Sequence, residues 1–257
     1  ARLSRAFLGQ PSEPIEVRVL GPTGVRTLRF ADQFFQVREK GEIVGIINSG
    51  VDITDWRASE KALKRREETE RQQAEHLAAL HEVSVALSAA KDMDEVCRRA
   101  IELGCRRLGF ERLGLWFNTD DPAVIAGSFG TDEHGSLRDE RGARRPVLPE
   151  WERWVRGTDA QEVFLDTQAP MMDQTGAVHG TGHRAVAGLW NGRRVVGFLS
   201  ADNLLTGQPI TEQRCRLLRL YAAFLGHLCS QRRAEEARTF SEQRYRTLVE
   251  NAEAAIS

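Results

Sequence analysis

The run AVAGLWNGRRVVGFLSADN, at residues 185–203, constrains the fold of this chain more than any other stretch. Two apolar segments flank Asn191-Gly192, and both residues of this dipeptide can adopt positive φ, which predicts a two-residue β-hairpin turn. Asp202 and Asn203 follow at a strand end, where we expect their short polar side chains to cap backbone groups. The chain must therefore build an antiparallel sheet around this hairpin.

Further strands are predicted on the N-terminal side of the hairpin. Residues 111–118, 123–130 and 161–166 are short apolar runs bounded by turn residues, which is typical of strands. Residues 150–157 predict a short helix instead, and residues 167–183, which are rich in Gly, His, Met and Asp, predict a long loop.

Two helices of this block have clear end signals. Asp92, followed three residues later by Glu95, is a capping-box-like start, and the apolar face that follows ends at Gly109. A last helix begins after Pro209, with Thr211 as its cap. Its broad apolar face comprises Leu217, Leu218, Tyr221, Phe224, Leu225 and Leu228.

The N-terminal region predicts a β-meander. The runs at residues 15–20, 25–31 and 42–51 alternate apolar and polar side chains with period two, as half-buried strands do. The turn sequence GPTG separates the first two runs, and Gly41 can take the positive φ needed to start the third. Three such strands form a sheet, but about 35 residues rarely enclose a core alone.

Between these two regions the sequence predicts a long charged helix from Asp55 to about Leu87. Acidic residues precede basic or amide residues by four positions, which stabilises an exposed helix. A weak seven-residue apolar seam, interrupted by Glu70, predicts a marginal homodimer contact. A second charged helix follows Gln231. The residues assigned to these dimer and linker helices are Trp56, Leu63, Ala74, Leu77, Leu80, Leu225 and Leu228.

Composition narrows the possible partners and location. The 257 residues are 41% hydrophobic and 28% charged with a net charge of −1, which gives no general electrostatic reason to bind nucleic acid. No apolar window approaches the ~20 residues that span a bilayer, and no signal peptide is present, so we expect a cytoplasmic location without membrane insertion. The four cysteines lack CxxC spacing and are expected to be reduced and packed.

These patterns resemble known sensory domains. Residues 76–231 resemble a GAF domain, chiefly through the hairpin run and the amphipathic helix that follows it. Residues 12–60 resemble the C-terminal half of a PAS domain, with Asp52, Thr54 and Asp55 ending its last strand and starting the exit helix. SEQRYRTLVENAEAAIS, at residues 241–257, looks like the helical entry into another PAS domain.

The resemblance implies a fold class and a division into parts. We expect an α+β fold in which a GAF-like antiparallel sheet packs against N- and C-terminal helices, preceded by a partial PAS β-meander and a coiled-coil-like linker helix. The implied parts are the PAS portion, the signalling linker, the GAF domain, and the exit helix with the start of a second PAS domain, at residues 1–54, 55–75, 76–231 and 232–257.

The resemblance also implies a function. The segment is expected to be a non-catalytic sensory and dimerisation part of a bacterial sensor histidine kinase, with a small-molecule ligand and a downstream output domain as partners. Two alternatives stay open: the regulatory segment of a diguanylate cyclase or phosphodiesterase, and a ligand-free GAF dimerisation scaffold. The sequence contains no phosphoacceptor box, nucleotide-binding Gly-rich motif or GGDEF motif.

In GAF domains a small ligand is held in the concavity on one sheet face under a roofing loop, which maps here to about residues 146–184. The resemblance places the pocket walls at Trp151, Trp154, Phe164, Asp166, Met171, Met172, His179 and His183, and its floor at Trp116, Phe129 and Trp190. The alternative is that these aromatic side chains simply fill the cavity.

Specific cofactor and catalytic chemistries find little support. His179 and His183 are four apart, but the two glycines between them disfavour a helix, so no metal site is expected. Residues 146–184 contain no Cys, which argues against a covalent bilin, and the cofactor is otherwise unidentified. A methionine sulfoxide reductase would need an accessible thiolate, whereas Cys97 and Cys105 lie on an apolar helix face. No catalytic residues are predicted.

Overall fold

The computed structural model describes residues 15–22, 24–30, 35–47, 49–148, 163–172 and 177–256, with backbone alone for Ile46 and residues 248–256. The chain divides into two compact units, Ala1–Ala74 and Glu75–Ser257. Helix α2 (Thr54–Ser88) contributes residues to both units. It has the length that its uninterrupted charged sequence predicts.

The first unit contains two small antiparallel sheets. Strands β1 (Ile15–Gly21), β2 (Gly24–Phe30) and β5 (Gly50–Asp52) form one sheet in the order β1-β2-β5. Strands β3 (Phe35–Glu39) and β4 (Glu42–Ile47) form the other. Among the described residues of this unit no side chain is buried.

The prediction of one three-stranded meander was therefore wrong. The third predicted run splits into β4, which pairs with the unpredicted strand β3, and β5, which pairs with β2. The reason is the turn at Lys40 and Gly41, whose φ values of 52° and 90° are both left-handed. A two-residue turn of this kind folds a strand back on its immediate predecessor.

The start of α2 matches the predicted junction. The amide and hydroxyl of Thr54 donate to Asp52 Oδ1 at 3.0 and 2.6 Å, and the Thr27 amide donates to Thr54 Oγ1 at 2.8 Å. The hydrogen bonds from Thr54 lower the pKa of Asp52. Short acceptors at a helix start satisfy amides that the helix leaves unpaired. Asp52 and Thr54 thus join the last strand to the helix.

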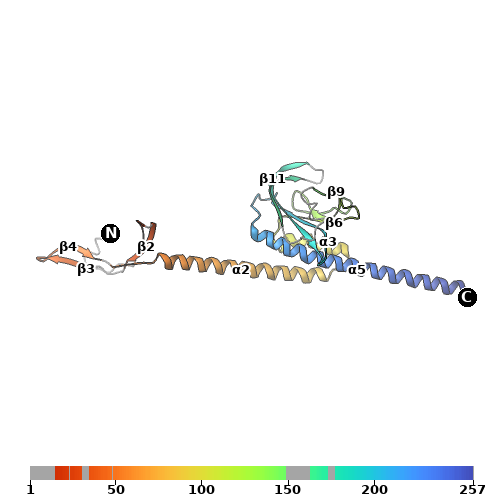
Figure 1. The fold of residues 1–257 in the computed structure, drawn as a ribbon, viewed down its shortest axis with the longest axis horizontal. Coiled ribbons are helices and arrows are strands. Elements are labelled where there is room, and N and C mark those ends of the chain that lie inside the picture. The colour runs from red at the N-terminus through yellow and green to blue at the C-terminus, as the bar shows by residue number, and fades with distance from the viewer. Residues whose placement is uncertain are drawn as a thin grey trace. The chain divides into compact units, whose positions relative to one another are not determined.

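The second unit is an antiparallel sheet covered on one face by helices (Figure 1). The strand order is β10 (Phe164–Met172), β11 (Val178–Trp190), β12 (Val195–Asp202), β6 (Arg112–Asn118), β7 (Val124–Thr131) and β8 (Leu137–Asp139), with β9 (Arg144–Pro146) also paired to β7. Helices α3 (Met93–Arg106) and α5 (Glu212–Ile256) cover the sheet. The predicted α+β class is confirmed.

The main core lies between this sheet and the helices. It unites the end of α2, α3, the first half of α5 and the inward-facing side chains of β6, β11 and β12. Tyr221 of α5 is fully buried and its hydroxyl donates to the carbonyl of Ala100 in α3 at 2.6 Å. The Asp92 cap is confirmed, since its carboxylate accepts from the Glu95 amide at 2.7 Å.

Leu225 and Leu228 belong to this core. Their exposed fractions are 0% and 8%, so neither side chain is available for the subunit contact to which the sequence pattern assigned them. The physical reason is that α5 begins as a core helix and presents its apolar face to the sheet. Leu80 is half-buried against the same core, whereas Trp56, Leu63 and Leu77 are more than half exposed.

The hairpin predicted at Asn191-Gly192 is confirmed, but its turn differs. Strand β11 ends at Trp190 and β12 begins at Val195, and in the turn between them only Gly192 takes a positive φ, of 92°. Asn191 instead uses its side-chain oxygen to accept from the amides of Arg193 and Arg194 at 3.0 and 2.9 Å. Asparagine thus supplies an acceptor rather than a left-handed residue.

The long loop predicted at residues 167–183 was also wrong. Strands β10 and β11 continue to pair through it, with Ala169 opposite Gly182 and Met171 opposite Gly180. The hydrogen bonds between two strands join backbone groups, so they need no particular side-chain pattern. In addition, register shifts on either side of Ala169 break the alternation of apolar and polar side chains by which strands are predicted. The short helix predicted at residues 150–157 lies outside the described residues.

Candidate functional site

The sheet face opposite the main core carries a second, smaller set of buried side chains. Along β12, Leu199 and Ala201 face the core, whereas Phe198, Ser200 and Asp202 alternate onto the other face. There Phe198 packs with Ile125, Val186 and Val195, and the partly buried Trp116, Phe164 and Trp190 lie against them. This apolar cluster forms one end of a concave surface.

Beside the cluster is a cavity of about 470 Å³. Its volume falls in the range of small-molecule sites, roughly 300–1,000 Å³. Strands β6, β7, β8, β9, β10, β11 and β12 all contribute to its wall. The apolar lining residues are Leu113, Trp116, Ile125, Pro146, Leu148, Pro170, Met171 and Met172, and the charged ones are Arg112, Arg138, Glu140, Arg145, Asp166, Arg184 and Asp202.

Arg112 is the most buried charged side chain of this wall, with 7% of the residue exposed. It lies opposite Asp202 in the β6–β12 register, and its Nε is 3.6 Å from Asp202 Oδ1. At this distance the two side chains form an ion pair, but the atoms are too far apart for a hydrogen bond. Burial raises the pKa of Asp202, and the Arg112 guanidinium opposes that shift.

The remaining carboxylates of the wall also have arginine partners. Glu140 accepts from Arg138 Nε at 2.9 Å, and Arg184 Nη2 lies 4.0 Å from Asp166 Oδ2. Arg145 instead lies over the ring of Trp116, with its guanidinium carbon 5.3 Å from the ring centroid. A guanidinium over an indole face is an attractive arrangement, and it holds both side chains at the cavity.

A glycine makes room for this wall. A Cβ at Gly130 would lie 2.8 Å from Glu140 Oε2, which is closer than real Cβ contacts allow. The missing side chain lets Glu140 lie flat against β7 and keep its pairing with Arg138. A larger residue at Gly130 would require this carboxylate to shift.

The structure brings four of the predicted site residues to the cavity: Trp116, Asp166, Met171 and Met172. Phe164 and Trp190 lie in the neighbouring apolar cluster on the same face. Trp151 and Trp154 lie outside the described residues.

Phe129 does not join the cavity floor and is buried in the main core instead. The cause is a β-bulge: Gly114 pairs with Gly130 but Trp116 pairs with Gly127, so β7 carries an extra residue opposite Leu115. The bulge shifts the alternation of β7, which places Phe129 and Ile125 on opposite faces although they are four residues apart.

His179 and His183 line a separate pocket of about 390 Å³ together with Asn203. The Asn203 side chain accepts from the His183 amide at 2.7 Å and donates to the Gln208 carbonyl at 2.8 Å, as predicted for a polar residue at this strand end. His183 Nδ1 accepts from the Ile210 amide at 3.3 Å. Among the described residues, no three metal-binding side chains come together.

The arginines of the cavity wall were not predicted from the sequence as site residues. For Arg112 the sequence did contain a usable signal. Arg112 stands at the start of the alternating apolar run of β6, and Asp202 stands at the end of the alternating apolar run of β12. Residues directly opposite each other on paired antiparallel strands, as Arg112 and Asp202 are, lie on one face of the sheet. Arg138, Arg145 and Arg184 carried no such signal, since their positions depend on how β8, β9 and β11 pair.

The cysteines lie away from the cavity. Burial raises the pKa of Cys105 to about 11 and also raises that of Cys215. Cys97 and Cys229 are buried together, and the hydrogen bond between them lowers the pKa of Cys97 and raises that of Cys229. A thiolate nucleophile needs both a low pKa and access, and none of the four thiols combines them.

No helix in the described part of the chain combines the length and apolar character that crossing a membrane requires.

Comparison with known proteins identifies the fold of the second unit. The sequence matches no protein-family model and no curated protein. The GAF domain from a phosphoenolpyruvate-protein phosphotransferase of Coxiella burnetii superposes with a TM-score of 0.52 at 13% identity, over 64% of this chain and 98% of that chain. This similarity shows a GAF-like fold.

Two further solved structures are less similar. The phycoerythrobilin-bound GAF domain from a cyanobacterial phytochrome has a TM-score of 0.49 at 11% identity, covering 64% of this chain and 99% of that one. The chromophore-binding domain of a bacteriophytochrome from R. palustris has a TM-score of 0.46 at 16% identity, covering 91% of this chain and 79% of that one.

Proposed function

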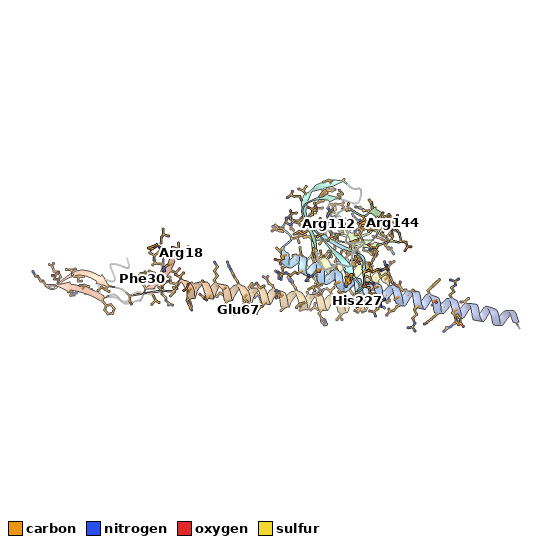
Figure 2. The ribbon with its side chains drawn as sticks, in the orientation of Figure 1. Arg18, Phe30, Glu67, Arg112, Arg144 and His227 are labelled. Carbon is orange, nitrogen blue, oxygen red and sulfur yellow. The ribbon has the colours of Figure 1, made fainter. Side chains whose placement is uncertain are left out.

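We propose that residues 76–231 are a GAF-type sensory domain that binds a small ligand in the 470 Å³ cavity and transmits the resulting change to helix α5. The observation that carries this proposal is the position of the cavity on one face of a sheet whose other face is covered by α5. Figure 2 labels Arg112 among the strands and His227 on the helix side. Only the sheet therefore separates a ligand in the cavity from α5.

The second half of α5 is held where it leaves the sheet. Arg232 Nη2 donates to the carbonyls of Ser88 and Ala90 at 2.8 and 2.9 Å, which lie at and just beyond the end of α2. Glu236 accepts from the Met93 amide at 3.0 Å, and this amide lies at the start of α3. α5 is thus bonded to the ends of two other helices.

Arg233 links this region to the sheet. Its guanidinium carbon lies 4.2 Å from the centroid of the Phe117 ring, at the end of β6. The same strand carries Arg112 and Trp116 on the cavity face. A ligand that shifts β6 therefore alters the contact made by α5, and rigid elements with two discrete arrangements are the physical means by which sites are coupled.

We propose the following context for this domain. Residues 1–54 are the C-terminal part of a PAS domain, residues 55–75 a signalling linker, and residues 232–257 an exit helix that opens a second PAS domain. The whole is a cytoplasmic, dimeric segment of a bacterial sensor histidine kinase, with its catalytic output domain elsewhere. A diguanylate cyclase or phosphodiesterase context would use the same relay.

Ligand binding is tested by native mass spectrometry of the full chain purified from a bacterial host. We expect one small molecule per chain, released on denaturation. Ser200→Phe, which places a ring in the cavity, is expected to abolish the adduct, while Ser230→Phe, on α5 away from the cavity, is expected to retain it. Repeated absence of any bound molecule would instead favour a ligand-free dimerisation scaffold, the second candidate function.

Dimerisation is favoured by the exposed apolar side chains of α2, among which Trp56, Leu63 and Leu77 follow the predicted seven-residue spacing. We expect Leu63→Lys to weaken association of the full chain at least tenfold by sedimentation velocity, since a charge enters the seam. Ala62→Lys places the same charge one position away and is expected to have little effect. A wild-type chain that stays monomeric at high micromolar concentration contradicts the dimer proposal.

A further inference from the structure

The cavity contains a buried guanidinium whose donors are not fully used. Arg112 Nη2 donates to the carbonyl of Met172 at 3.4 Å, but Nε and Nη1 have no hydrogen-bond partner among the described residues, although both atoms are buried. A buried polar group without a partner is uncommon in folded proteins, because it loses its hydration without compensation. The site therefore presents hydrogen-bond donors that an incoming acceptor can satisfy.

The charges of the wall favour a negative acceptor. Its three carboxylates are each associated with one arginine: Asp202 with Arg112, Asp166 with Arg184, and Glu140 with Arg138. Arg145 is a fourth cation in the wall, and it lies over the Trp116 ring. Arg138 Nη1 is buried without a hydrogen bond among the described residues, but it lies 3.9 Å from Glu133 Oε2, with which it forms an ion pair. The lining thus holds one more cation than anion.

The rest of the wall is apolar. The Trp116 ring, Ile125 and Met171 face the same cavity as the arginines. Sites of this composition bind ligands whose polar group is oriented by a few placed donors and whose body fills an apolar space.

We infer that the ligand of this cavity is a small organic anion. Its carboxylate or phosphate group accepts hydrogen bonds from the unused N–H groups of Arg112, and its apolar, planar body packs against Trp116, Ile125 and Met171. This inference rests on the proposed function and specifies the class of ligand. Guanidinium groups suit both kinds of anion, since planar N–H donors match carboxylate and phosphate oxygens.

The test uses four probes with one apolar body: naphthalene-2-carboxylate, 2-naphthyl phosphate, naphthalene-2-carboxamide and 2-naphthylmethylammonium. Binding to the ligand-free full chain is measured by isothermal titration calorimetry. We expect the carboxylate or the phosphate to bind at least tenfold more tightly than the amide and the ammonium. Which of the two anions binds better distinguishes a carboxylate ligand from a phosphate ligand.

Variants of Arg112 separate anion recognition from general apolar binding. We expect Arg112→Gln to weaken the preferred anion at least tenfold and to leave the amide unchanged, because hydrogen bonds to charged groups are among the stronger ones. The matched control is Arg144→Gln, which removes an exposed guanidinium that does not line the cavity. Asp202→Asn is the second variant, and it is expected to tighten anion binding by removing the negative partner of Arg112.

Several outcomes would overturn the inference. They are equal affinity of wild type for the four probes, no binding of any probe, or the same anion affinity in Arg112→Gln and Arg144→Gln. If Arg112→Gln does not fold, the test rests on Asp202→Asn. Anion binding that is unchanged or weaker in this variant would then overturn the inference. Native mass spectrometry that finds a bound ligand without an anionic group would overturn this inference and leave the sensory proposal intact.

Discussion

Replacing Leu225 by alanine is expected to lower the free energy of unfolding of the second unit by about 3–5 kcal/mol. The side chain is fully buried between α5 and the sheet, so its removal loses apolar burial and leaves a cavity that close packing cannot fill. For a unit of this size the loss corresponds to roughly 6–20 °C in melting temperature. Thermal unfolding of the full chain followed by circular dichroism measures it.

Leu220→Ala is the matched control for Leu225→Ala, since it removes the same atoms from the same helix at a side chain that is 43% exposed. We expect it to cost less than about 1 kcal/mol. Comparison of the two decides whether Leu225 stabilises the fold or a subunit contact. A concentration-dependent melting temperature that disappears in Leu225→Ala would point to a subunit contact and contradict the core assignment.

Gly226→Ala is expected to destabilise the second unit by about 2–3 kcal/mol, although alanine is the better helix former by about 1 kcal/mol. A Cβ at this position would lie 2.5 Å from the Trp190 carbonyl oxygen and 2.6 Å from the Leu189 carbonyl carbon. These are backbone atoms of β11, so α5 must move away from the strand. Chemical denaturation of the full chain measures the loss.

Gly142→Ala serves as the control for Gly226→Ala, because a Cβ at Gly142 meets no atom within 4 Å and its φ is not left-handed. Its unfolding midpoint is expected to match wild type. Stabilisation by Gly226→Ala would mean that helix propensity outweighs the contact, and that α5 does not pack on β11 as closely as the structure has it.

The elements that were predicted well have strong local signals. Helix α2 has a long uninterrupted run of helix-forming residues, α3 has the Asp92 cap, and the β11–β12 hairpin has the Asn191-Gly192 dipeptide. In each case the cause lies within a few residues of its effect. The unpredicted pairing of β10 with β11 and the strand β3 have no such signal, because their partners supply the hydrogen bonds.

The candidate site was predicted only in part for the same reason. Trp116 and Met171 were placed at a pocket by resemblance to a family, and both line the cavity. Phe129 was assigned to the same pocket, but the extra residue of β7 moves it into the core. A single inserted residue exchanges the two faces of a strand, and apolar residues give no warning of it because they suit either face.

What the sequence alone determined is the set of local elements: a charged linker helix, a capped helix, an amphipathic last helix and a hairpin between apolar runs. Only the tertiary structure decided that Leu225 and Leu228 cover a sheet instead of a partner, and that Arg112 is buried beside a cavity. The physical reason is that burial depends on which surface lies opposite a side chain. That surface comes from strands and helices distant in sequence, whereas caps and turns are satisfied by neighbouring residues.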